Sequence, residues 1–538
     1  MKKTLRSLMV LLMTFVMVFA TVISVNAEQA EMLADAPNVF ASGMPVVKDK
    51  ITVSILGAKH PIHGNWDQME FFKIMDEMTN ITLEFNTPPW DMFTEQKNLA
   101  FTTDSYPEVF FGSMLTAKEE VTYGAEGILI PLEDLIDQYA PNVLAMFDAN
   151  PGLRGSITAP DGHIYSLPNI TSAPIGMVYA PNWYNIEWLD ALGVSEADLP
   201  DTLDGLYDLL VRMKNEDPNG NGEADEIPFI FSDKVGDGLF NDFLAPFGIA
   251  ARRVYVQDGV VKYGFLEENF VYFLEYVNKL WSEKLIDQES FAQDWSMKTG
   301  KTQTGIVGLT VEAVPDTAFG VPDPAEAAKY PMSPAWSTDY SPKATLRGTG
   351  LTTGVFAISN KCENVEAIMR WVDYLYSEEG SLLIHYGPEN NLYKVLENGM
   401  YEYIIPEDGR GTEEKRGGEL TPDCGLALPK WVRSMTETNW NSPLQQARAV
   451  QVDEKLWPNA VLAMPNLYFT LEEQQELDII MTDLNKYEDE NAAKYITGEL
   501  ALADWSNFTD QIMRMQVERV VEINQAAYDR WVIANNPS

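Results

Sequence analysis

The chain has 538 residues, of which 46% are hydrophobic and 22% are charged, and this composition excludes a disordered or collagen-like protein. Its length is enough for two to four domains of about 100–200 residues each. The 80 acidic and 38 basic residues give a formal net charge of −42, which argues against a nucleic-acid partner and favours neutral small molecules, cations or sugars.

The first segment of the chain indicates export. Lys2, Lys3 and Arg6 precede an uncharged apolar run from Leu8 to Val25, and small residues at Val25 and Ala27 form a signal-peptidase site. We therefore expect a signal peptide over residues 1–27, cleaved after Ala27. An uncleaved membrane anchor is the alternative, because the run approaches the ~20 residues that span a bilayer. The segment has no lipobox cysteine, so we expect an extracellular or cell-envelope protein without a lipid anchor.

The predicted fold begins after a stretch that lacks periodicity. Residues 28–48 carry scattered Ala, Pro and acidic residues, and we expect them to form a flexible leader. The β-branched stretch Ile51–Leu56 then predicts a strand, apolar residues at helical spacing over 71–78 predict a helix, and Ile81–Phe85 predicts a second strand. Strand, helix and strand in this order indicate an α/β domain.

A third predicted strand marks a candidate ligand site. It is predicted after a helix over 96–103, as the apolar run at 107–111 that ends at Gly112. Ligands bind such sheets at the carboxyl ends of strands. Phe111 and Ser113 are therefore candidate ligand-binding residues.

The rest of the chain continues as α/β and ends in helices. Helices are expected over 132–139, 188–193, 203–213 and 270–281, and strands over 304–310 and 354–359. The last third is predicted to be mainly helical, over 365–377, 471–487, 490–496 and 505–531.

Two cysteines, Cys362 and Cys424, are too few for a disulfide scaffold or a four-thiolate zinc site. They could form one bridge in an oxidising compartment. We favour two buried thiols that pack as small apolar residues.

One motif predicts a metal site. Oxygen-bearing side chains stand at positions 1, 3, 5, 9 and 10 of the stretch that begins at Asp217, with a glycine at position 6. This spacing matches the first half of an EF-hand calcium loop, although Pro228 replaces the bidentate Glu of position 12. An ordinary Asn/Gly turn is the alternative. The expected ligands of a structural calcium ion are Asp217, Asn219, Asn221, Glu223 through its carbonyl, Asp225 and Glu226.

Aromatic residues suggest a sugar site. Several tryptophans lie in loop-like segments beside Asn, Asp, Pro or Ser, an arrangement in which an apolar ring stacks on a sugar while polar groups hold its hydroxyls. Any one of them could instead be part of the core, and we expect about half to face a cleft. The candidate ligand-binding tryptophans are Trp66, Trp90, Trp183, Trp295, Trp336 and Trp440.

Signals for enzymatic chemistry are weak. His60 and His63 flank a proline and do not form a helical metal pair, and neither a G-x-S-x-G motif nor a P-loop occurs in the sequence. With 80 acidic residues, a glycosidase pair of carboxylates cannot be identified by inspection. We therefore expect a protein that is not an enzyme.

Together these residues resemble the family 1 extracellular solute-binding proteins of ABC transporters, in particular the branch that includes alginate-binding periplasmic proteins and Gram-positive sugar-binding lipoproteins. The resemblance extends from about Ile51 to Arg530, and its more specific parts are the calcium loop and the segment Tyr374–Gly380. Further matching segments are 105–109, 132–142, 188–193, 496–499 and 525–530.

The resemblance implies an α/β, two-lobed periplasmic-binding-protein fold of type 2, with hinge strands and a helical C-terminal part. We expect residues 49–170 and 355–390 to form the first lobe, and residues 171–354 and 391–538, with the calcium loop 217–228, to form the second. The implied function is to capture an oligosaccharide, which we expect to be neutral, between the lobes and to deliver it to an ABC transporter permease. We expect a monomer. The alternatives are a secreted carbohydrate-active enzyme and a peptide or other-solute binder on the same fold.

Overall fold

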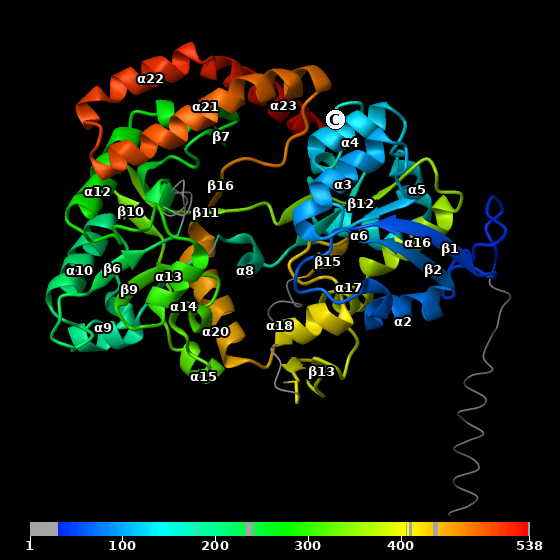
Figure 1. The fold of residues 1–538 in the computed structure, drawn as a ribbon, viewed down its shortest axis with the longest axis horizontal. Helices are drawn as coiled ribbons and strands as arrows, with labels where there is room; N and C mark the ends of the chain where they lie inside the picture. The colour runs from blue at the N-terminus through cyan, green and yellow to red at the C-terminus, as the bar shows by residue number, and fades with distance from the viewer. Residues whose placement is uncertain are drawn as a thin grey trace, which may run out of the picture.

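The computed structural model describes residues 31–535, except 180, 233–238, 241–242, 405, 408–411 and 434–439, and for residues 412–413 it describes the backbone alone. The expected signal peptide, residues 1–27, lies outside the described residues. The chain forms two bodies side by side, which we call lobe 1 (mainly blue and cyan) and lobe 2 (mainly green), with the C-terminal helices along one side of both (Figure 1). Each lobe has its own large apolar core.

Lobe 1 is built on a six-stranded sheet in the order β15-β4-β12-β3-β1-β2. Strand β12 runs antiparallel to both of its neighbours, whereas β1 is parallel to β2 and β3, and β15 is parallel to β4. The bounds are β1 (Ile51–Leu56), β2 (Ile81–Asn86), β3 (Val109–Phe111), β4 (Leu167–Thr171), β12 (Leu351–Ile358) and β15 (Lys430–Val432).

Helices cover the sheet of lobe 1 because each has an apolar face that the sheet buries. On α2, for example, Phe71, Phe72 and Met75 are buried, at the spacing the sequence showed. The predicted strand at 51–56, helix at 71–78 and strand at 81–85 are confirmed. The helices are α2 (Glu70–Thr79), α3 (Trp90–Thr102), α4 (Ala117–Ala125), α5 (Glu133–Tyr139), α6 (Pro141–Ala149), α7 (Leu153–Ser156), α16 (Val365–Leu375) and α17 (Glu378–Tyr386).

The expected flexible leader is wrong for its described part, residues 31–48. Val39, Val46 and Val47 are buried in the core of lobe 1. The amide of Val46 donates to the carbonyl of Thr79 at 3.1 Å, and the Arg370 guanidinium donates to the carbonyl of Gly43 at 2.8 Å. Contacts with distant parts of the chain therefore order a segment that has no periodic pattern of its own.

Lobe 2 contains two three-stranded sheets, in the orders β5-β9-β6 and β10-β11-β16, and a hairpin of β7 and β8. Its strands are β5 (Asn182–Tyr184), β6 (Ile227–Ile230), β7 (Val254–Gln257), β8 (Val260–Tyr263), β9 (Val307–Val311), β10 (Trp336–Thr338), β11 (Ser341–Arg347) and β16 (Ala460–Leu462). Its helices are α9 (Ile186–Leu192), α10 (Leu203–Asn215), α12 (Phe270–Ser282), α13 (Trp295–Thr302), α14 (Pro315–Phe319), α15 (Pro324–Ala327) and α20 (Pro443–Gln451).

The boundary between the lobes differs from the expected division after residue 390. Strand β15 pairs in parallel with β4 and so completes the sheet of lobe 1. Between α17 and β15, the hairpin of β13 (Tyr393–Val395) and β14 (Tyr401–Tyr403) packs with α17 around Trp440, and α18 (Thr412–Lys415) lies nearby (Figure 1). The chain therefore returns to lobe 2 near Asn441, where α20 follows.

Two connecting segments run side by side between the lobes. Residues 172–179, which include α8 (Pro174–Met177), lead from β4 to lobe 2, and residues 347–351 lead back from β11 to β12. The bridge between Val178 and Arg347 joins the two segments.

The C-terminal helices span both lobes (Figure 1). The helices α21 (Leu471–Thr497), α22 (Trp505–Arg514) and α23 (Val517–Asn535) bury apolar residues in the core of lobe 2. At the far end of α23, the indole Nε1 of Trp531 donates to Ser156 Oγ of lobe 1 at 2.8 Å. No helix in the described part of the chain is long and apolar enough to cross a membrane.

A glycine in β12 provides a test of the packing of lobe 1. Gly354 has φ +68°, and a Cβ atom there would lie 1.9 Å from the carbonyl oxygen of Leu115. We expect Gly354→Ala to lower the free energy of unfolding by at least about 3 kcal/mol, because it adds a clash with the main chain to the strain of a left-handed residue. Gly127→Ala, with φ +70° and nothing within 4 Å, is the matched control and should cost only the strain. Urea unfolding measures both, and equal losses would contradict the crowding at Gly354.

Candidate functional site

Six of the eight residues predicted to bind ligand are buried in this structure. Their exposed fractions are below 9%, so they do not offer a surface to a ligand here, and their candidate role in ligand binding is corrected. Four of the six predicted tryptophans are among them, where about half were expected to face a cleft. Burial is the physical reason: a tryptophan in a short strand or tight loop still gains most by packing its large apolar surface. The six are Trp66, Phe111, Ser113, Trp183, Trp336 and Trp440.

Three of these belong to the core of lobe 1 next to the strand ends. The ring of Trp66 stacks on Phe72 at 5.5 Å and meets the edge of Phe111 at 6.1 Å. Ser113, directly after β3, donates from Oγ to the carbonyl of Gly354 at 3.3 Å. These contacts pack Trp66 against α2 and the end of β3, and join the residue after β3 to β12.

The other three fill cores elsewhere. Trp183 on β5 donates from Nε1 to the carbonyl of Glu312 at 2.9 Å, and Trp336 on β10 stacks on Phe243 at 5.1 Å. Trp440 stacks on Tyr403 at 3.9 Å. The strands β5 and β10 have three residues each, so the sequence pattern made them look like loops.

The two remaining predicted residues keep part of their surface accessible. Trp90 begins α3 in lobe 1, is half-buried, and its ring meets His60 edge to face at 5.4 Å. Trp295 begins α13 in lobe 2, is 54% exposed, and donates from Nε1 to Glu312 Oε2 at 2.8 Å. Each ring therefore stands beside a polar group, one in each lobe.

Two further tryptophans lie next to the connecting segments, and sequence reasoning missed both. Trp431 on β15 donates from Nε1 to Ser172 Oγ at 3.0 Å, and the Arg433 guanidinium lies 3.8 Å from the centre of its ring. Trp457, in the short 3-10 helix Trp457–Asn459, has the Arg347 guanidinium at 5.3 Å. Both are half-buried. Trp457 stands beside Pro458, the kind of neighbour that selected Trp66 and Trp90, whereas Trp431 lies between Lys430 and Val432 and offered no such signal.

The two guanidinium groups at this junction are available as hydrogen-bond donors. Within the described part of the chain, neither Arg347 nor Arg433 forms an ion pair, and their side-chain hydrogen bonds go to main-chain carbonyls. An arginine has five N–H donors, so each keeps unused donors beside an indole face. Flat apolar faces with adjacent donors can bind the faces and hydroxyl groups of a sugar. We call Trp90, Trp295, Trp431 and Trp457 the accessible tryptophan set.

A neutral histidine fixes the loop that carries His60. His63 Nε2 lies 2.7 Å from the main-chain oxygen of Cys424, and its Nδ1 accepts from the indole of Trp66 at 3.3 Å. Because Nδ1 accepts, Nε2 carries the hydrogen and donates it to Cys424. Burial lowers the pKa of His63 to about 4. Both Cys424 and Cys362 are free thiols; Cys424 is buried, as the sequence interpretation expects, whereas Cys362 is partly exposed.

The predicted calcium loop joins α10 to β6 and is held by its own side chains. Asp225 Oδ1 accepts from the amides of Asn219 at 3.0 Å and Asn221 at 3.1 Å. Asp217 Oδ2 accepts from the amide of Gly222 at 3.1 Å. The side chains of positions 1, 3, 5 and 9 of the motif therefore converge in this structure.

The position of Glu226 fits a cation in this loop. Its Oε1 is buried and accepts no hydrogen bond from a described residue. Burial and then the charges of Asp225 and Asp217 raise the pKa of Glu226. In the described residues no three His, Cys, Asp or Glu side chains stand close enough to hold a metal by themselves, so a cation here would also need the Asn and main-chain oxygens.

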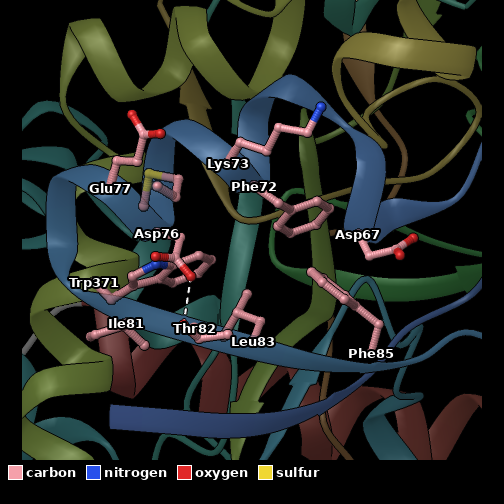
Figure 2. Close-up of a pocket in the computed structure, with 11 residues that line it drawn as sticks. Asp67, Phe72, Lys73, Asp76, Glu77, Ile81, Thr82, Leu83, Phe85 and Trp371 are labelled. Atoms are coloured by element: carbon pink, nitrogen blue, oxygen red, sulfur yellow. Dashed lines mark hydrogen bonds between the residues drawn. The ribbon is translucent and has the colours of Figure 1, made fainter. Parts of the chain in front are cut away.

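The cavities of the two lobes do not coincide with the accessible tryptophan set. One of about 290 Å³ lies between α2 and the edge strand β2, with Phe72, Phe85 and Trp371 around an apolar interior and Lys73 and Glu77 among the charged residues that line it (Figure 2). In it, Asp76 accepts a hydrogen bond from Thr82 (Figure 2). Another, of about 490 Å³, lies on lobe 2 beside α10, α12 and the turn between β10 and β11.

The protonation state of His63 predicts how the stability of the fold depends on pH. Its folded pKa lies below the ordinary 6.5, so its contribution to stability is present above about pH 6.5 and is lost as the pH falls to about 4. We expect His63→Gln to remove about 3 kcal/mol of that pH dependence, from about 2.5 pKa units at 1.36 kcal/mol each. Urea unfolding between pH 4 and 7 measures the difference between variant and wild type.

His163 is the matched control for this experiment. Its hydrogen bond with Glu133 raises the pKa of His163, so its stabilising contribution is present at low pH and lost as the pH rises. His163→Gln should therefore change the pH profile in the opposite sense. A wild-type profile in His63→Gln would contradict the neutral donor assigned to His63.

Comparisons with known proteins find a family and solved structures to which this chain is similar. A family model described as bacterial extracellular solute-binding protein matches residues 69–381, more than half of the chain. The fructooligosaccharide ABC transporter substrate-binding protein FusA of Streptococcus pneumoniae serotype 4 is 25% identical over 515 residues, which cover 91% of this chain and 92% of FusA.

Solved structures agree in fold. FusA in complex with kestose has a TM-score of 0.73 at 24% identity, covering 90% of this chain and 99% of that one, and an EF-hand mutant of FusA with fructo-nystose has the same TM-score at 23% identity. A human-milk-oligosaccharide-binding protein of Bifidobacterium longum infantis has a TM-score of 0.76 at 21% identity, covering 90% and 99% of the two chains. The alginate-binding protein AlgQ2, solved without calcium ion, has a TM-score of 0.68 at 21% identity, covering 91% and 100%.

These matches confirm the predicted two-lobed solute-binding fold with a helical C-terminal part. They also agree with the family resemblance drawn from the sequence motifs. The chain belongs to the bacterial extracellular solute-binding proteins.

Proposed function

We propose that this protein is exported, captures a neutral oligosaccharide between its lobes, and delivers it to the permease of an ABC transporter without chemical change. The observation that carries the proposal is the likeness to FusA along 91% of the chain, together with the matching two-lobed fold. FusA is a fructooligosaccharide ABC transporter substrate-binding protein, and the matched structures include it with kestose. Fructose-containing oligosaccharides are therefore the first ligands to test.

The accessible tryptophan set supports a ligand held by both lobes. Trp90 and Trp431 belong to lobe 1, and Trp295 and Trp457 belong to lobe 2. A saccharide in contact with rings on both lobes would bind the closed arrangement better than the open one, and this differential affinity is what drives closure. We propose that the connecting segments 172–179 and 347–351 act as the hinge.

We also propose that the loop from Asp217 to Glu226 binds a structural calcium ion. Its Asn side chains gather around the Asp225 carboxylate, and these residues, with the buried Glu226 Oε1, carry the hard oxygen donors that calcium prefers. Asp217, Asn219, Asn221, Asp225 and Glu226 would hold it through side chains and Glu223 through its carbonyl. Bound cation would offset the repulsion between Asp217 and Glu226 and so stabilise the connection between α10 and β6.

The ligand is tested by titration calorimetry of residues 28–538. The probes are kestose, nystose, an acidic oligosaccharide and a short peptide. We expect binding of a neutral saccharide without hydrolysis, and hydrolysis of the bound sugar would favour the carbohydrate-active enzyme instead. Binding of the peptide alone would overturn the saccharide assignment.

Single substitutions in the accessible tryptophan set test the site. We expect Trp431→Ala and Trp90→Ala each to raise the Kd for the bound saccharide at least tenfold, a loss of about 1.4 kcal/mol or more from a stacked ring. Tyr272→Ala on α12 is the control, because it removes a 41% exposed aromatic ring of lobe 2 away from the connecting segments. Equal effects of all three variants would contradict the proposed location.

Calcium removal tests the metal site. A ligand that binds only the folded state at a hundredfold excess over its Kd stabilises that state by about 2.7 kcal/mol. We therefore expect EDTA to lower the melting temperature and calcium to restore it. Asp217→Asn should abolish this response. Glu223→Gln should keep it, because only the carbonyl of Glu223 is expected to bind, and a response unchanged in both variants would refute the proposed ligands.

A further inference from the structure

A buried carboxyl group connects lobe 1 to a segment of lobe 2. Glu120 on α4 is 1% exposed. Its Oε2 accepts from Ser166 Oγ at 2.7 Å and from the Tyr468 hydroxyl at 3.0 Å. Its Oε1 accepts no hydrogen bond from a described residue. A buried carboxyl with one unsatisfied oxygen is costly when it is ionised.

Tyr468 makes this contact a link between the lobes. Its segment, residues 463–470, leaves β16 and enters α21, and both of these elements belong to lobe 2. The Tyr468 side chain is nevertheless 7% exposed and belongs to the core of lobe 1. The segment therefore inserts one ring into lobe 1. Its path is the orange connection that leaves β16 and reaches α21 (Figure 1).

The same carboxyl is coupled to the strand that enters lobe 1 from lobe 2. Ser166 Oγ, which donates to Glu120, accepts from the amide of Gly354 on β12 at 3.1 Å. Thr349, in the connection that leads to β12, donates to Asn466 Oδ1 at 3.2 Å. Glu120 is thus joined to two of the segments that must move if the lobes move.

The basic residues near Glu120 pair with other carboxylates and not with Glu120. On its own helix, Glu119 pairs with Lys97 at 2.8 Å. Of the helices packed nearby, α21 supplies Asp478, which pairs with Lys118 at 2.5 Å, and Glu473, which pairs with Arg530 of α23 at 2.5 Å. These cations are engaged. Burial therefore outweighs the hydrogen bonds from Ser166 and Tyr468, which favour the ionised form, and raises the pKa of Glu120 to about 7.

We propose that Glu120 is a proton-operated latch: its neutral form holds the segment 463–470 in lobe 1, and its ionisation releases Tyr468 and loosens the two lobes. Ionisation favours release because water can solvate the carboxylate only once the Tyr468 ring moves away. This inference goes beyond the proposed function, which requires no dependence on pH.

The direction and size of the effect follow from linkage. In the released form Glu120 is solvated and has its ordinary pKa of 4.5, against about 7 in the latched form. The equilibrium therefore shifts toward release as the pH rises from about 4.5 to about 7, and stays shifted above. A difference of about 2.5 pKa units corresponds to a shift on the order of 10²-fold at most.

Hydrogen–deuterium exchange of residues 28–538 at pH 5.5 and pH 8 tests the latch, with exchange times scaled for the intrinsic effect of pH. We expect peptides that cover 463–470 and the amide of Gly354 to exchange faster at pH 8. Peptides from α10 in lobe 2 and α5 in lobe 1 should not change. Glu120→Gln, which cannot ionise, should abolish the difference, and a difference that persists in it would overturn the proposal.

A pair of tyrosine variants keeps the test decisive if Glu120→Gln fails to fold. Tyr468→Phe removes the hydroxyl that links the lobes, so we expect faster exchange at 463–470 at both pH values. Tyr106→Phe is the matched control, since Tyr106 is also 7% exposed and donates to Asn360 Oδ1 at 3.1 Å within lobe 1. If the two variants change the exchange of residues 463–470 equally, Glu120 is only a buried acid of lobe 1 and the latch is refuted. Faster exchange at pH 8 throughout lobe 1 would refute it as well. No saccharide is used, so this result is independent of the proposed function.

Discussion

Strand β12 imposes the constraint on which the rest of the architecture depends. It lies between β3 and β4 and runs antiparallel to both, yet the chain reaches it only after passing through most of lobe 2. Lobe 1 therefore cannot complete its sheet from contiguous sequence. Strand β15, at one edge of this sheet, likewise comes later in the chain than most of lobe 2. Such a sheet requires connections that run side by side, as 172–179 and 347–351 do. The same requirement brings Trp431 and Trp457 next to these connections, because β15, which carries Trp431, pairs with β4, and β16, which follows Trp457, pairs with β11.

The periodicity of apolar residues predicted those helices and strands that bury one face along their own length. Strand β1, helix α2 and strand β2 lie within one or two residues of their expected bounds, because each buries a face whose period is visible in the sequence. The three-residue strand β15 is too short to have a period, and only its pairing with β4 assigns it to lobe 1. Residues 31–48 were missed for a related reason. Their order depends on hydrogen bonds to the main-chain carbonyl of Thr79 and from the Arg370 guanidinium, which no pattern within the segment shows.

The candidate sites show the same distinction. The calcium motif could be found in the sequence because its oxygen atoms come from one continuous loop, and the structure brings Asp217, Asn219, Asn221 and Asp225 together. The proposed tryptophan site would be assembled from four distant segments, so proximity in sequence carries no information about it. Polar neighbours did not separate accessible from buried rings either. Trp66 and Trp90 have similar sequence surroundings, but Trp66 fills the space between Phe72 and Phe111, whereas Trp90 stands at the first turn of α3.

The charge of the whole chain and the charge at the lobe junction have opposite signs. The net charge of −42 is spread over the surface, and at physiological salt its influence decays within about 8 Å. Arg347 and Arg433, in contrast, lie against the rings that the proposed ligand would touch. A guanidinium at hydrogen-bond distance acts on a ligand far more strongly than distant, screened carboxylates. In the proposed site, the two arginines therefore donate hydrogen bonds to the hydroxyl groups of a neutral saccharide, and the acidity of the chain serves its solubility instead.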